Sequence, residues 1–175
     1  MRVLVSDSFN CAVLDSGCSS NVCGEDWANC YLETLDKEHK KNVKTFKSKT
    51  WFKFGDGIKL QSLKKIRIPC EIAGTRCRID TDVVSSDIPL LLGKPSMKRC
   101  QMTLDMVNDT ATIFDRKVKL SSTPSGHYFI PLSFTTSSQT ISDVLLTIGD
   151  TSEEKRKALL KLHRQYSHPS ARRLK

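Results

Sequence analysis

The sequence predicts a mainly β domain over residues 1–132, built as a β-barrel or β-sandwich with short helices, and a helical tail after it. Short segments rich in β-branched and aromatic residues recur at close spacing in this region, and turn-forming residues separate them. Hydrophobic residues make up 38% of the chain and charged residues 27%, a balance that favours a globular core over disorder. A chain of 175 residues suits one ordinary domain with a short appendage.

The first elements follow from hydrophobic patterning. The apolar run NCAVLD (10–15) predicts a strand. In GEDWANCYLETLDKEHKKNV (24–43), apolar side chains recur at helical spacing and a charged run follows, which predicts a helix and then a solvated loop. TWFKF (50–54) and IKLQSL (58–63) alternate on either side of Gly55-Asp56-Gly57, a pattern typical of a β-hairpin.

The later elements extend the same pattern. KIRIPCEI (65–72) and RCRIDTDVV (76–84) flank a short turn and predict a second hairpin. KPSMKRC (94–100) directly follows Gly93 and predicts a short helix with Pro95 near its first turn. Four further apolar segments predict the remaining strands: MTLDMV (102–107), TATIFD (110–115), KVKL (117–120) and YFIPL (128–132).

The end of the chain differs from the domain in composition. Residues 133–152 are rich in Ser and Thr and predict a linker, whereas residues 153–175 predict a basic helix. The formal net charge is +9, of which residues 153–175 carry +6 (eight Lys or Arg against two Glu). We therefore expect any nucleic-acid contact to be weak and to involve this tail.

Two features concern the cellular environment. The chain has neither a run of about 20 apolar residues nor an apolar leader after Met1-Arg2, so we expect a soluble cytoplasmic protein without membrane contact. It has seven cysteines, an odd number, and no Cys-x-x-Cys pair. We therefore expect reduced, buried thiols instead of a disulfide framework or a local zinc knuckle.

Asp15 is the first candidate functional residue, because it ends an apolar run and precedes Ser16-Gly17. A buried lone carboxylate is costly unless it is paired, hydrogen-bonded or protonated. Two later segments could serve such a site: the Gly-rich hairpin FKFGDGIKL (52–60) as a lid, and IPLLLGKPSM (88–97) as a strand that packs behind the Asp15 loop. The alternative is a turn-capping carboxylate on an inert β-barrel.

These residues resemble the retropepsin-type aspartic proteases of LTR-retrotransposon gag-pol polyproteins and their domesticated relatives. The likeness covers about residues 10–132 and rests on AVLDSG (12–17), FGDG (54–57) and LLLGK (90–94). It implies a closed β-barrel that works as a homodimer on its own polyprotein, in the cytoplasm or in virus-like particles, without a cofactor. The implied roles are catalytic for Asp15, Ser16 and Gly17, substrate-binding flap for Phe54, Gly55, Asp56 and Gly57, and support of the Asp15 loop for Leu91, Leu92 and Gly93.

The resemblance also implies a mechanism in which each chain contributes one Asp15. Two carboxylates about 3 Å apart share one proton, because both cannot easily be ionised at that distance. The ionised member acts as a base toward a bridging water, and the protonated member acts as an acid toward the scissile carbonyl. Ser16 would form hydrogen bonds across the pair, and Gly17 would allow close backbone approach.

In the tail, LLKLHRQYSHPSARRL (159–174) resembles the start of the zinc-binding region that precedes integrase cores in the same polyproteins, although Ser167 stands where glycine is usual. His163 and His168 would supply only half of a tetrahedral zinc site, so we expect no metal site here.

Two other functions remain open from the sequence. The chain could be an inactive or domesticated module that keeps the fold for dimerisation or binding, since only fourteen residues precede Asp15 and a shortened amino terminus would weaken dimers. It could also be a nucleic-acid-binding fragment that acts through its basic tail.

Overall fold

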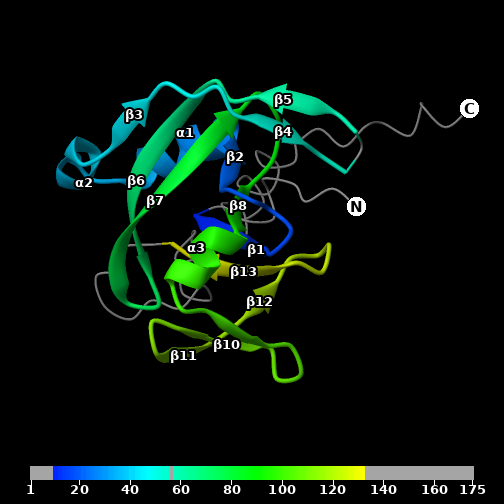
Figure 1. Ribbon diagram of the computed structural model, residues 1–175. Helices are drawn as coiled ribbons and strands as arrows, with labels where there is room; N and C mark the ends of the chain where they lie inside the picture. Colours follow the sequence, from blue (N-terminus) through cyan, green and yellow to red (C-terminus); the bar gives the residue numbers. More distant parts are fainter. Residues whose placement is uncertain (1–9, 56, 133–175) are drawn as a thin grey trace, which may run out of the picture. The chain divides into compact units, whose positions relative to one another are not determined.

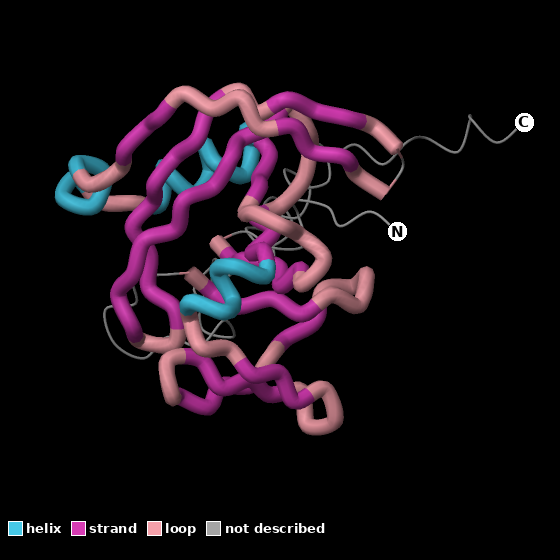
Figure 2. Tube along the Cα trace, viewed as in Figure 1, coloured by secondary structure: helices cyan, strands magenta, loops and turns pink. Residues whose placement is uncertain are grey.

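The computed structural model describes residues 10–55 and 57–132. Strands dominate this part of the chain, and the three helices in it are short, which confirms the prediction of a mainly β fold with short helices (Figure 2). The linker and the basic helix that the sequence predicts over residues 133–175 lie outside the described residues.

Eight strands form one mixed sheet, the largest element of the fold. In chain order they are β1 (Cys11–Asp15), β2 (Val22–Gly24), β3 (Lys44–Phe46), β6 (Lys64–Ile72), β7 (Thr75–Val84), β8 (Leu90–Gly93), β12 (Ser121–Ser122) and β13 (Tyr128–Pro131). Their order in the sheet is β12-β13-β1-β8-β2-β7-β6-β3 (Figure 1). Among the described residues no ladder joins β12 to β3, so the hydrogen bonds of this sheet do not close on themselves.

The centre of the sheet brings distant segments together. β1 runs parallel to β8 and antiparallel to β13, and β2 pairs with both β8 and β7. The parallel register places Asp15 directly opposite Gly93. The C-terminal ends of β1 and β8 therefore lie side by side, although Asp15 and Gly93 are 78 positions apart in the sequence.

The β6–β7 hairpin is the longest ladder, and it carries much of the core. Its turn consists of Ala73 and Gly74, both with positive φ (50° and 70°), as a two-residue type I′ hairpin turn requires. Alternate residues of β6 are buried, including Ile66, Ile68 and Cys70. They pack with buried side chains from α1, β8 and β13 in the main core.

The helices cover parts of this core. In α1 (Glu25–Thr34), the rings of Trp27 and Tyr31 are buried and stacked, with centroids 5.1 Å apart. α3 (Lys94–Arg99) begins directly after Gly93 with a proline in its first turn, as predicted. The expectation of a solvated loop after α1 is wrong in part, because Lys37–Lys41 forms α2. The backbone N–H of His39 donates to the Asp36 carboxylate at 2.7 Å, and this cap stabilises an otherwise exposed short helix.

Two small sheets complete the described chain. β9 (Thr103–Asp105), β10 (Thr110–Ile113) and β11 (Arg116–Lys119) form a three-stranded sheet, and β4 (Trp51–Lys53) pairs with β5 (Lys59–Gln61). The β4–β5 hairpin projects from the large sheet as a two-stranded arm (Figure 1). We call residues 51–61 the flap from here on.

Candidate active site

Asp15 stands at the end of β1, and its own turn holds its carboxylate. Its Oδ1 accepts hydrogen bonds from the backbone N–H groups of Gly17 (2.9 Å) and Cys18 (3.2 Å). The Asp15 side chain is half-buried, whereas Ser16 and Gly17 are exposed. Because β1 is paired on both sides, the carboxylate has a fixed position and still reaches the surface.

The thiol of Cys18 lies against this carboxylate. Burial raises the pKa of the Cys18 thiol to about 12, and the Asp15 charge and a hydrogen bond to Asp15 add to the rise. The thiol is therefore protonated at neutral pH and can donate a weak hydrogen bond to the carboxylate. Cys18 therefore helps to orient the Asp15 carboxylate through both its backbone N–H and its thiol.

Gly93 allows the Asp15 loop to lie close to β8. A Cβ atom at position 93 would lie 2.9 Å from the carbonyl oxygens of Cys18 and Ser20, so only glycine fits without a shift of the backbone. The next N–H, from Lys94, donates to the Cys18 carbonyl at 3.0 Å. Leu92 is buried in the main core beneath the loop, and Leu91 points to the other side of β8.

Asn21 holds the other end of the Asp15 loop, a role that the sequence analysis did not assign. Its side chain is only 5% exposed. The amide oxygen accepts from the Gly93 N–H at 2.9 Å, while the amide nitrogen donates to the Asp80 carbonyl (2.8 Å) and the Ser96 hydroxyl (2.9 Å). One buried amide therefore joins the loop to β8, β7 and α3.

The flap has the predicted form of a hairpin with a glycine-rich tip. Phe54 N–H donates to the Ile58 carbonyl at 3.0 Å, and Gly57 N–H donates to the Phe54 carbonyl at 2.9 Å. Gly57 has a φ of 84°, a conformation that glycine adopts without strain. Gly55 is exposed, and Asp56, the remaining predicted flap residue, lies outside the described residues.

A small apolar cluster connects the flap to the Asp15 loop. Its buried centre consists of Val22, Val84 and Ile88. Partly buried side chains pack around this centre, from the flap (Phe52, Phe54 and Leu60), from the Asp15 loop (Cys18) and from β8 (Leu91). The structure therefore brings together three of the segments that the sequence analysis selected: the Asp15 loop, the flap and the 91–93 strand.

Asp82 anchors both ends of the flap, a role that was not predicted from the sequence. This side chain is 1% exposed. Its Oδ1 accepts from the hydroxyls of Ser48 (2.5 Å) and Ser62 (2.8 Å), which lie just before β4 and just after β5. Its Oδ2 lies 3.3 Å from the Lys65 ammonium group, and its backbone N–H donates to the Asn21 carbonyl. The flap base and the Asp15 loop thus share β7 as a support.

The surroundings of the site limit what one chain can do. A cavity of about 360 Å³ is lined by four flap residues, Trp51, Phe52, Lys53 and Lys59, and Asp15 is not among its lining residues.

Within residues 10–55 and 57–132, no group of three or more His, Cys, Asp or Glu side chains could hold a metal ion. In that part of the chain, no helix is long and apolar enough to cross a membrane. His163 and His168 lie outside the described residues.

The chain is similar to the retroviral protease-like domain of Ddi1 from Leishmania major, at 13% identity and a TM-score of 0.35, over 78% of this chain and 99% of that chain. No family model matches the sequence, and no curated protein matches it. The function proposed below therefore rests on the geometry of the Asp15 loop and the flap.

Proposed function

We propose that this domain is an aspartic endopeptidase of the retropepsin type, active as a homodimer with one Asp15 from each chain. The observation that supports this most directly is the position of Asp15. Its carboxylate is fixed at the end of β1 by two backbone N–H groups, opposite a glycine that lets the loop pack closely. A hairpin flap packs against the same loop through a shared apolar cluster.

A second copy supplies what one chain lacks. Residues 15–24 contain a single carboxylate, whereas water activation between two carboxylates requires a pair. Ser16 and Gly17 are exposed at the tip of the loop, so the corresponding loop of a partner can approach them across a twofold axis. One carboxylate of the pair would then remove a proton from the bridging water, while the other protonates the scissile carbonyl oxygen.

The flap suggests the class of substrate. Phe52, Phe54 and Leu60 form its half-buried inner face, and exposed lysines alternate with them on the outer face. An extended peptide with apolar side chains suits such an inner face, since a strand presents alternate side chains to one surface. We propose that the physiological substrate is the retroelement polyprotein from which the domain derives, cleaved in the cytoplasm.

The test is peptide cleavage with a matched pair of variants. Wild-type protein at high concentration and mildly acidic pH should cleave members of a mixed peptide library, with the products identified by mass spectrometry. Asp15→Asn should abolish cleavage, a loss of at least about a thousandfold, because no base remains to activate water. Asp115→Asn, which changes an exposed carboxylate in the β10–β11 turn, should leave cleavage unchanged. Equal cleavage by Asp15→Asn would contradict the proposal.

A transition-state mimic of the pepstatin type gives an independent test, because it should bind only an assembled pair of carboxylates. It should raise the melting temperature of the wild type and leave that of Asp15→Asn unchanged. Absence of both cleavage and stabilisation, with only monomers in sedimentation, would favour an inactive binding module instead.

The charge of residues 153–175 supports a second, separate candidate, weak nucleic-acid binding by the tail. Binding to single-stranded RNA should weaken steeply with salt and disappear when these residues are deleted. If RNA binding survives the deletion, the domain binds RNA and the tail does not account for it.

A further inference from the structure

Two cysteines face each other across the β6–β7 hairpin, outside the Asp15 loop and the flap. Cys70 and Cys77 are directly paired in the antiparallel register, and their sulfur atoms are 3.3 Å apart. Directly opposite residues of antiparallel strands have Cα atoms about 4.5–5.5 Å apart, which lies within the range that disulfides span. A disulfide needs the two sulfurs at about 2.05 Å, so a small side-chain rotation would suffice.

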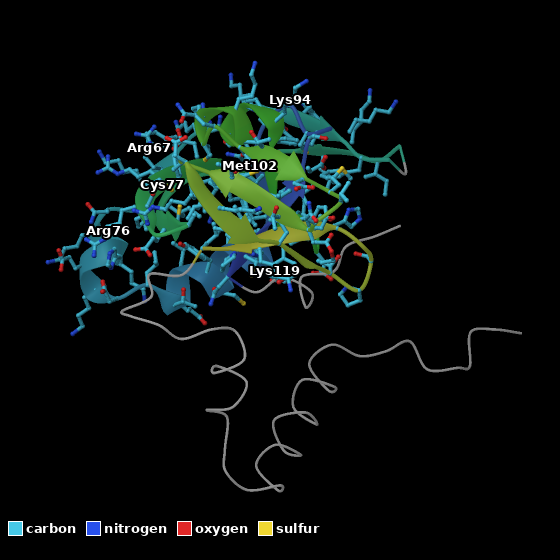
Figure 3. The ribbon with its side chains drawn as sticks, turned by 90° about the horizontal axis from the view of Figure 1, so that it is seen from below. Arg67, Arg76, Cys77, Lys94, Met102 and Lys119 are labelled. Atoms are coloured by element: carbon cyan, nitrogen blue, oxygen red, sulfur yellow. The ribbon has the colours of Figure 1, made fainter. Side chains whose placement is uncertain are left out.

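The two thiols differ in access. Cys70 is fully buried, with 0% of its surface exposed, whereas Cys77 is half-buried on the adjacent strand. Figure 3 shows Cys77 on this hairpin, on the side of the fold where Arg67 and Arg76 also lie. A dissolved reagent can therefore reach Cys77 first, and Cys70 stands behind it.

The two thiols also differ in acidity. The hydrogen bond between the two sulfurs lowers the pKa of Cys77, because a thiol that donates to a thiolate favours the ionised form. The same bond, together with burial, raises the pKa of Cys70. The thiolate is the reactive form of cysteine, so the accessible member of the pair is also the more nucleophilic.

We propose that Cys70 and Cys77 form a dithiol–disulfide redox site whose oxidant is a peroxide. The Cys77 thiolate attacks one oxygen of hydrogen peroxide, an S–O bond forms, the O–O bond breaks, and hydroxide leaves as water after taking a proton. The sulfur of Cys70 then gives up its proton and attacks the sulfenic sulfur of Cys77, which forms the S–S bond and releases a second water. The two thiols lose two electrons in total, and the peroxide is reduced to two waters.

The surrounding contacts hold the hairpin in place on both sides of the pair. The Tyr31 hydroxyl donates to the Pro69 carbonyl at 2.8 Å, and Arg116 donates to the Ala73 carbonyl at 3.1 Å. The two strands therefore stay in register while the sulfurs react. The disulfide would act as a reversible clamp across the hairpin that carries much of the core.

Peptide mapping of the full chain tests this proposal. Reduced protein is treated with hydrogen peroxide, free thiols are alkylated, and the chain is digested with trypsin, which cuts after Arg67, Arg76 and Arg78. The disulfide should appear as residues 68–76 linked to the dipeptide 77–78, and dithiothreitol should remove this species. Mixing chains with and without ¹⁵N label distinguishes a bond within one chain, which gives no mixed-label species, from a bond between chains.

Three variants provide controls. Cys70→Ser and Cys77→Ser should each eliminate the linked species, whereas Cys30→Ser, at a half-buried position on α1, should leave its yield unchanged. Two results in the wild-type protein would overturn the proposal. In the first, Cys77 is recovered alkylated or as sulfinic acid while other cysteines have formed disulfides. In the second, the linked species carries mixed label, which shows a bond between chains. Both results are read from the wild-type protein, so they do not depend on the folding of any variant.

Discussion

At the scale of single residues, the Asp15 loop depends on two positions that carry no chemistry themselves. Gly93 supplies the space for the loop, and Asn21 supplies three hydrogen bonds that join it to neighbouring elements. The loop is therefore held mainly by backbone contacts and one buried amide. Its geometry should be more sensitive to these two residues than to the exposed Ser16.

Gly93→Ala should destabilise the protein by about 1–3 kcal/mol, because the new methyl group would meet backbone atoms that cannot move independently. The φ of Gly93 is −73°, which alanine adopts freely, so the cost is steric. Gly55→Ala is the control, since a Cβ there meets nothing within 4 Å. Urea unfolding of both variants measures the difference. An equal effect at the two positions would contradict the close contact at Gly93.

Asn21→Ala should lower the free energy of unfolding by about 1–3 kcal/mol, because it leaves a buried N–H, a carbonyl and a hydroxyl with fewer partners. Asn29→Ala, on the exposed face of α1, should change it by less than about 0.5 kcal/mol. The same two variants can be compared in the cleavage assay. If Asn21→Ala keeps both stability and cleavage, Asn21 does not position the loop.

At the scale of elements, β7 links the flap to the Asp15 loop. Its residue Asp82 bonds to serines at both ends of the flap, and its backbone pairs with β2 beside the loop. Asp80, two residues earlier on the same strand, forms a surface ion pair with Arg67 instead. Neighbouring carboxylates on one strand face thus have different roles, one fully buried and one half-buried.

Asp82→Asn should destabilise the protein by about 1–3 kcal/mol, because an amide replaces a buried carboxylate that accepts two hydroxyls and faces Lys65. Hydrogen exchange should also become faster at Ser62, whose N–H donates to the Thr50 carbonyl at the flap base. Asp80→Asn, at a side chain that is 40% exposed, is the matched control for hydrogen exchange at Ser62. Unchanged exchange at Ser62 in Asp82→Asn would show that this carboxylate does not anchor the flap.

The Asp80–Arg67 pair predicts a specific dependence of stability on pH. A hydrogen bond from Arg67 lowers the pKa of Asp80 below its usual value, and the charge of Arg67 adds to this. The stabilisation is therefore present above the unfolded-state pKa and is lost as pH falls through the lower folded-state pKa. The stability difference between wild type and Asp80→Asn should shrink on acidification below about pH 4. A difference that is constant or grows in acid urea titrations would contradict this sign.

The hairpins and the Asp15 strand could be predicted from the sequence because alternation and turn residues are local signals. β2, β3 and β12 have only two or three residues, too few to show a period, and α2 depends on a single cap at Asp36. Asn21 and Asp82 were missed because their partners are distant: Asn21 meets a serine 75 positions away, and Asp82 meets one 34 positions away.

At the scale of the whole molecule, the proposed function makes this chain one half of an active site. One chain supplies one oriented carboxylate, one flap and one apolar inner face. Under this proposal a second copy of the chain, related by a twofold axis, provides the second carboxylate. Activity should therefore depend on protein concentration, with a steep decline on dilution below the dissociation constant of the dimer.

The measurement that tests this claim most directly is a mixing experiment. A fixed amount of wild-type protein, held above the dissociation constant of the dimer, is mixed with increasing Asp15→Asn, and peptide cleavage is followed. Random pairing predicts that cleavage falls to about one quarter at a threefold excess of the variant, because mixed dimers hold a single carboxylate. Cleavage that stays constant as Asp15→Asn is added would show that Asp15 does not act in a pair shared between chains.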